Sequence, residues 1–127
     1  MKKKNLPKES TPFWRTTLNA LNGIGLGLES ERSLRLHFVA MFLVSTLGLM
    51  LQISLIEWGI LFLTFALLTG LELANTAIET LADFIHPDVH PAVKRLKDIA
   101  AGSVFVAAIF AVAIGIVVFF PKIFVNL

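Results

Sequence analysis

The sequence predicts an all-α membrane protein, with three transmembrane helices preceded by an amphipathic helix on the membrane surface. Of its 127 residues 56% are hydrophobic, and the mean hydropathy is +0.79. Charged residues make up 16% of the chain, whereas about 25% is usual in soluble domains. Three long apolar runs each approach the roughly 20 residues that a helix needs to cross a bilayer. Cysteine is absent, which excludes a disulfide framework and a catalytic thiolate.

The first element is a surface helix, expected at about residues 13–28. Residues 1–12 are expected to form a mobile tail, because Pro7 and Pro12 bracket that segment. Beyond it, apolar and polar residues occupy different helical faces: Trp14, Leu18, Leu21 and Leu28 on one, and Arg15, Asn19 and Asn22 on another. This segregation is typical of a helix that lies in the plane of the membrane interface.

Three membrane helices follow, at about residues 33–53, 56–85 and 93–121. With the surface helix they form a single domain, residues 13–127. The first apolar run is Phe38–Ile56, and the second, Trp58–Leu71, continues its helical pattern to about Ile85. The segment "HPDVHP" (86–91) ends that helix with two prolines, and Ile99–Phe120 supplies the third crossing.

The distribution of positive charge predicts the orientation, since Lys and Arg gather on the cytoplasmic side. Basic residues lie before the first span and between the second and third: Lys2, Lys3, Lys4, Lys8, Arg15, Arg32, Arg35, Lys94, Arg95 and Lys97. The loop between the first two spans has none, and the C-terminal end has only Lys122. The N-terminus and the second loop are therefore expected in the cytoplasm.

A row of polar residues interrupts the second membrane helix. Their spacing places them on one face of the helix: Glu72, Asn75, Thr76, Glu79 and Asp83. At about 1.5 Å per residue, Glu72 lies about 21 Å beyond Trp58, and Glu79 about 31 Å beyond it. With a bilayer core about 30 Å thick, Glu72 is expected inside its cytoplasmic half and Glu79 at its inner edge.

Three interpretations of these carboxylates remain open from the pattern alone. A protected carboxyl such as Glu72 suits a general base, and an ionised Glu79 suits Mg²⁺, which prefers oxygen ligands. Together they fit a reaction between a lipid hydroxyl and a magnesium nucleotide. Alternatively, Glu72 pairs with another helix and holds an oligomer together. A third interpretation is a small oligomeric membrane protein that conducts protons or ions, because intramembrane carboxylates also mark proton relays.

Two stretches resemble the prokaryotic diacylglycerol kinase family, which includes the bacterial undecaprenol kinases. "ELANTAIETLAD" (72–83) matches the family pattern Glu-x-x-Asn-[Ser/Thr]-Ala-Ile-Glu, and "DVHPAVKRLKDIAAGSVFVAAIFAV" (88–112) contains the Lys-Asp that opens the third helix. The resemblance covers about residues 13–120. It implies an ATP- and Mg²⁺-dependent lipid kinase in the bacterial inner membrane, a homotrimer whose active sites lie near the cytoplasmic interface. ATP and a membrane lipid alcohol are the expected partners, and no nucleic acid is expected.

The resemblance also implies roles for individual residues. Glu72 is similar to the general base on the lipid hydroxyl, Asn75 to a polar partner in the same site, and Glu31 and Glu79 to Mg²⁺ ligands. Asp88, His90, Lys97 and Asp98 match nucleotide contacts, and Asn19 is expected to add one from the surface helix. Arg35 matches a position near the lipid substrate, and Arg15 is expected near it as well. The chain departs from the family at Pro12, Asn19 and Asn22, where larger residues are frequent.

The acceptor is expected to be undecaprenol, and diacylglycerol is the alternative. Thr76, the His90–Pro91 pair, "KDIAAGSV" (97–104) and the ending "FFPKIF" (119–124) are more similar to the undecaprenol kinase branch. The apolar residues themselves suit an isoprenoid chain and an acyl chain equally.

Overall fold

The computed structural model describes residues 11–125 and is helical throughout that part of the chain. Its elements are α1 (Phe13–Ser30), α2 (Arg32–Met50), α3 (Leu55–Ile85), α4 (Pro91–Phe120) and a final π-helical turn, η1 (Pro121–Val125). Each helix begins and ends within three residues of the range expected from the sequence, and α1 and α2 are separated by a single residue, Glu31.

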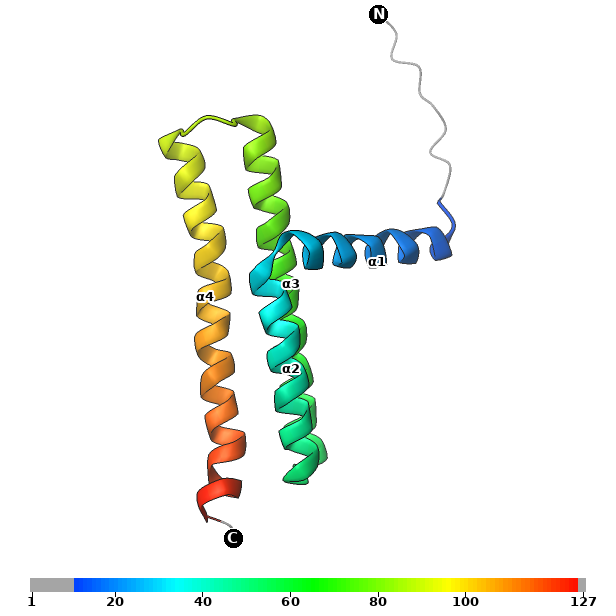
Figure 1. The fold of residues 1–127 in the computed structure, drawn as a ribbon, viewed down its shortest axis with the longest axis vertical. Coiled ribbons are helices and arrows are strands. Elements are labelled where there is room, and N and C mark those ends of the chain that lie inside the picture. Colours follow the sequence, from blue (N-terminus) through cyan, green and yellow to red (C-terminus); the bar gives the residue numbers. More distant parts are fainter. Residues whose placement is uncertain (1–10, 126–127) are drawn as a thin grey trace, which may run out of the picture.

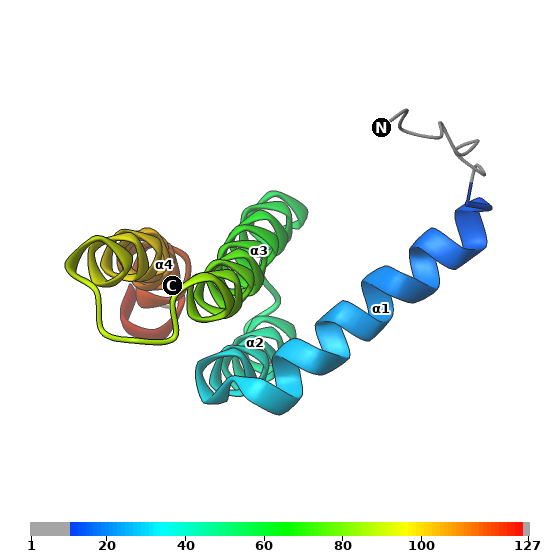
Figure 2. The ribbon, with the colours of Figure 1, turned by 90° about the horizontal axis from the view of Figure 1, so that it is seen from above.

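Three helices run side by side and are long and apolar enough to cross a membrane. These are α2, α3 and α4, the last continued by η1, as the sequence predicts. Helices α3 and α4 form an antiparallel pair that packs along its length, and α2 lies against α3 (Figures 1 and 2). The described chain therefore has the architecture of a multi-pass membrane protein.

Helix α1 leaves this bundle crosswise and points away from it (Figures 1 and 2). The change of direction occurs at Glu31, whose backbone is extended between the two helices. The guanidinium of Arg35 donates to the carbonyl oxygens of Leu28 and Glu29, at 2.7 and 3.0 Å. These carbonyls belong to the last turn of α1, which has no partner for them within the helix. Arg35 thus ties the end of α1 to the beginning of α2.

The corner also depends on a close approach between α1 and α3 at Gly27. A Cβ atom added there would lie 2.7 Å from Cδ2 of Leu73 and 3.0 Å from Cδ2 of Leu34. Leu34 is completely buried beneath this contact. The end of α1 therefore sits at the level of Leu73 on α3.

The opposite end of the bundle holds a cluster of buried apolar side chains. Ile53, Leu61, Val118 and Phe119 form a buried cluster there. Ser54 and Glu57 form a capping box that satisfies the free N–H groups at the start of α3. Lys122 of η1 reaches Glu57 at 3.2 Å and links the C-terminal turn to the same point.

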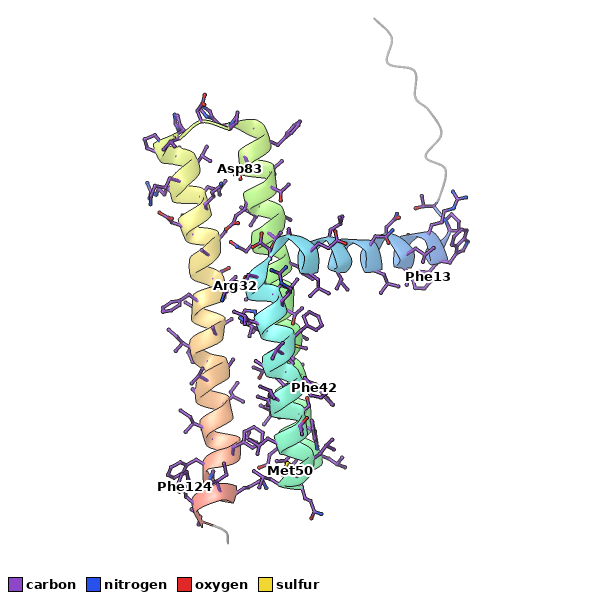
Figure 3. The ribbon with its side chains drawn as sticks, viewed as in Figure 1. Phe13, Arg32, Phe42, Met50, Asp83 and Phe124 are labelled. Atoms are coloured by element: carbon purple, nitrogen blue, oxygen red, sulfur yellow. The ribbon has the colours of Figure 1, made fainter. Side chains whose placement is uncertain are left out.

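Because α3 is longer than α2, the far part of the polar row on α3 lies beyond the end of α2. Helix α2 has 19 residues and is about 28 Å long, whereas α3 has 31 and is about 46 Å long. Helix α2 ends at Met50 and α3 begins nearby at Leu55, so α3 continues well past the corner, together with the facing part of α4 (Figure 1). In Figure 3 Asp83 lies on this projecting part, beyond the corner marked by Arg32.

Candidate active site

The site begins with a carboxylate buried between α2 and α3. Glu72 is 4% exposed and is the one charged residue buried among those described. The hydroxyl of Ser33, in the first turn of α2, donates a hydrogen bond to Oε1 of Glu72. Because Ser33 stands at the very start of α2, Glu72 lies at the end of the stretch that all three helices share.

The next turn of α3 carries an amide and a second carboxylate. Nδ2 of Asn75 donates to Oε1 of Glu79 at 3.1 Å. Oδ1 of Asn75 is buried and has no hydrogen-bond partner. Thr76 turns its hydroxyl back to the carbonyl of Glu72, at 3.0 Å. The unpartnered oxygen beside Glu79 marks a place that a hydrogen-bond donor or a cation would complete.

A basic residue of α4 faces the far end of the row. Nζ of Lys97 forms an ion pair with Oδ1 of Asp83, one helical turn beyond Glu79. A hollow of about 210 Å³ lies beside this pair and is lined by Asp88, His90 and Lys97 among others. Three residues assigned to the nucleotide are therefore together in one place. This hollow lies roughly 17 Å along α3 from Glu72.

Several of the predicted nucleotide and lipid contacts also form bonds within the chain. Asp98 follows Lys97 in sequence but is exposed and pairs with Lys94 at 2.6 Å. The ring of His90 accepts a hydrogen bond from the backbone N–H of Ala92 at 3.2 Å and caps α4. Arg35 closes the corner, as described above. Each of these side chains has a structural contact of its own in the chain.

Two residues of α1 lie far from the buried carboxylate within one chain. Asn19 and Arg15 are eight and twelve residues before Gly27, or about 12 and 18 Å along the helix. Figure 3 shows Phe13, their neighbour, at the free end of α1. The guanidinium of Arg15 lies 5.2 Å from the centroid of the Trp14 ring instead. The structure of one chain does not bring these two residues to Glu72.

The two proposed metal ligands, Glu31 and Glu79, lie at different heights along the bundle. Glu31 stands at the corner, whereas Glu79 lies seven residues beyond Glu72, about 10 Å along α3. Within residues 11–125 no group of three or more His, Cys, Asp or Glu side chains is close enough to hold a metal ion. The oxygen atoms of Glu79 and the unpartnered Asn75 still fit a hard cation, because Mg²⁺ takes few protein ligands and keeps several waters.

Sequence reasoning did not assign a role to Ser33 or to Asp83. Asp83 belongs to the polar row, but its pairing with Lys97 depends on how α4 packs against α3. Ser33 carries no signal of its own in the sequence, since serine is common in the first turn of a helix. Its position two residues after Glu31 is the one feature that connects it with the site.

Comparison with known proteins agrees with these features. The family model described as prokaryotic diacylglycerol kinase matches residues 18–119. An undecaprenol kinase of Bacillus subtilis (strain 168) is 38% identical over 122 residues, covering 96% of this chain and 99% of that protein. A diacylglycerol kinase of Synechocystis is 36% identical over 94 residues, or 73% of this chain and 54% of that protein. A diacylglycerol kinase of Helicobacter pylori (strain J99) is 29% identical over 89 residues, 70% of each chain.

Proposed function

The chain belongs to the prokaryotic diacylglycerol kinase family of lipid kinases, and from this premise we propose that it transfers the γ-phosphate of ATP to the hydroxyl of a membrane lipid alcohol. The acceptor we propose is undecaprenol, with undecaprenyl phosphate as the product. The observation that carries the proposal is the buried carboxylate of Glu72, which stands where the apolar part of the bundle meets its polar end.

The helix lengths support a definite placement in the bacterial inner membrane. The length of α2, about 28 Å, suits a hydrocarbon core about 30 Å thick. Helix α1 then lies in the inner interface, where its apolar face would be covered by lipid. By the positive-inside rule, the charges described above favour a cytoplasmic N-terminus and a cytoplasmic loop around Asp88. Glu72 is then level with the inner boundary, and Glu79 and Lys97 lie on the side of water and nucleotide.

The acceptor can approach Glu72 from the apolar side. A hollow of about 310 Å³ begins one turn below it, between α2, α3 and α4, and is lined by His37, Met41, Leu61, Phe65, Leu68 and Val112 among others. Nδ1 of His37 is buried there without a partner. An isoprenoid chain in this hollow would leave its hydroxyl near Glu72. The Glu72 carboxylate would take the hydroxyl proton as the oxygen attacks the γ-phosphorus and ADP leaves.

The polar end of the bundle would bind ATP. Lys97 now pairs with the exposed Asp83, and the phosphate oxygens would compete for the same ammonium group. Glu79, with Glu31 and the oxygen of Asn75, would hold Mg²⁺. The ion would neutralise charge on the β- and γ-phosphates, which is the main requirement of phosphoryl transfer. Asp88 and His90 line the hollow on the outer side of this group.

We propose that the working unit is a homotrimer. The part of α3 that projects beyond α1 has apolar side chains on its surface, such as Leu81 and Phe84, the latter 86% exposed. In the aqueous interior of the cell such side chains need a partner. A neighbouring copy would also bring its own α1, and so Asn19 and Arg15, toward a site that one chain leaves without them.

The test is a transfer assay with both candidate lipids. Purified full-length chain in detergent micelles is given radiolabelled [γ-³²P]ATP, Mg²⁺ and an equimolar mixture of undecaprenol and diacylglycerol. We expect label in undecaprenyl phosphate. Label in phosphatidic acid instead would identify a diacylglycerol kinase, the activity that the Synechocystis relative's name states. No label in either lipid would overturn the proposed function.

A further inference from the structure

The hydroxyl of Ser33 is the one side-chain group of the described residues that donates to the buried Glu72 carboxylate. It joins α2 to α3 across 39 positions of sequence. We propose that Ser33 is a positioning residue, which fixes the orientation of the Glu72 carboxylate for proton abstraction from the lipid hydroxyl. This inference rests on the proposed function, since it assigns to Ser33 the task of holding the base of that reaction.

The bond is unusual among the hydroxyls of the described residues. Thr17, Thr46, Thr64, Thr76 and Thr80 each donate to the carbonyl four residues earlier in their own helix. Such local bonds are the usual outcome for Ser and Thr within helices. Ser33 lacks this option, because the residue four positions earlier, Glu29, belongs to α1 beyond the corner. Its hydroxyl is therefore free to reach α3. Thr69 also donates across to another helix, but to the thioether sulfur of Met41 at 3.6 Å, whereas Ser33 reaches a carboxylate.

The corner fixes the hydroxyl where it is needed. Arg35 holds the last carbonyls of α1 at 2.7 and 3.0 Å and so anchors the first turn of α2, on which Ser33 stands. Gly27 brings the same corner against Leu73, the neighbour of Glu72. The start of α2, which carries Ser33, and the part of α3 next to Glu72 are thus held together at the corner, and a positioning group requires such support.

The chemistry explains why one bond matters. A carboxylate has two oxygens, and within residues 11–125 Ser33 occupies Oε1. Rotation of the carboxylate is then restricted, and Oε2 is left as the oxygen that accepts the substrate proton. A base must lie within about 3 Å of that proton, and a misplacement of about 1 Å costs about a hundredfold in rate. Loss of the Ser33 hydroxyl should therefore slow the chemical step and leave substrate binding intact.

The experiment compares Ser33→Ala and Ser33→Thr with the unaltered chain in the micelle assay, using undecaprenol and ATP as probes. Ser103→Ala is the matched control, because the Ser103 hydroxyl donates only to the carbonyl of Ala100 in its own helix. We expect kcat to fall about 10- to 100-fold in Ser33→Ala, with the KM of both substrates unchanged. Ser33 is exposed, so threonine has room, and Ser33→Thr should restore most of kcat. Ser103→Ala should behave as the unaltered chain.

The outcomes separate this inference from the function beneath it. An active chain that is silenced by Glu72→Gln but keeps full kcat in Ser33→Ala would overturn the role of Ser33 alone. The same holds if the loss appears mainly in KM, if Ser33→Thr is as slow as Ser33→Ala, or if Ser33→Ala no longer folds by circular dichroism. An unaltered chain that phosphorylates no lipid would overturn the proposed function and this inference together.

Discussion

Replacement of Glu72 by glutamine is the sharpest test of the buried carboxylate. Glutamine has the same shape and keeps a carbonyl oxygen, which can still accept the hydrogen bond from Ser33. It cannot take a proton. The folded chain should therefore persist, while any step that depends on a base at this position should be lost.

The expected magnitudes differ between stability and rate. A general base contributes about 10²- to 10⁴-fold, and at about 1.4 kcal/mol per factor of ten this is about 3 to 5.5 kcal/mol of activation free energy. The effect of Glu72→Gln on unfolding should stay below about 1 kcal/mol, because the hydrogen bond is kept. Glu72→Leu is the contrasting variant, since it removes the hydrogen bond from Ser33 to a charged group, a kind of bond worth about 1.5 to 3 kcal/mol of stability.

The assay is transfer of labelled phosphate to undecaprenol in micelles, with circular dichroism and size-exclusion chromatography on the same preparations. We expect Glu72→Gln to be folded, to bind ATP normally and to retain at most about 1% of the rate. A Glu72→Gln chain with a tenth or more of the original rate would refute the assignment of the base. A chain that is inactive because it has lost its helical signal would refute the argument about stability.

Three further predictions concern the metal, the nucleotide and the corner. Glu79→Gln should raise the Mg²⁺ concentration needed for half-maximal rate, whereas Glu29→Gln, an exposed control on α1, should not; an unchanged titration in both would exclude Glu79 as a ligand. Lys97→Met should raise the KM for ATP at least about tenfold, because bonds to charged groups are worth about 1.5 to 3 kcal/mol; an unaffected KM would exclude phosphate binding there. Gly27→Ala should be about 1 to 3 kcal/mol less stable than Gly25→Ala, because a Cβ at position 27 meets neighbouring side chains whereas one at position 25 does not. Equal melting temperatures of the two variants would contradict the close approach at Gly27.

The helical architecture was predictable because it depends on the order of residues along the chain. The length of an apolar run can be read directly from the sequence, so three helices long enough to span a membrane were expected, and the structure confirms them. The two prolines of "HPDVHP" (86–91) likewise predicted the end of α3 and the start of α4. The family followed from a short motif, and the comparison confirms it.

The arrangement at the site was less predictable because it depends on how helices sit against one another. Periodicity placed Glu72, Asn75 and Glu79 on one face, but the pairing of Glu72 with Ser33 depends on the relative position of α2 and α3. The partner of Lys97 depends in the same way on how α4 lies against α3. The roles assigned to the site residues stay predictions that the assays above address.

The crosswise course of α1 shows a second limit of periodicity. An amphipathic pattern predicts that a helix has a polar face and an apolar face. It does not predict at what height along the bundle the helix turns away from it. That level is set by Gly27 against Leu73 and by the Arg35 bonds. It decides how much of α3 projects beyond the corner, and hence how far Glu79 lies from the corner.

Stability and chemistry occupy opposite ends of this bundle, and this separation follows from the residues at each end. At one end Ile53, Leu61 and Val118 are buried together, and Glu57 binds both the start of α3 and Lys122. At the other end Ser33 donates to Glu72, and large apolar residues beyond the corner, such as Leu81 and Phe84, are exposed. A lipid kinase of this size needs its reactive end open to lipid on one side and nucleotide on the other, so the packing that resists unfolding must lie elsewhere. Substitutions in the cluster around Leu61 should therefore lower the melting temperature with little change in kcat, whereas Glu72→Gln should lower kcat with little change in the melting temperature.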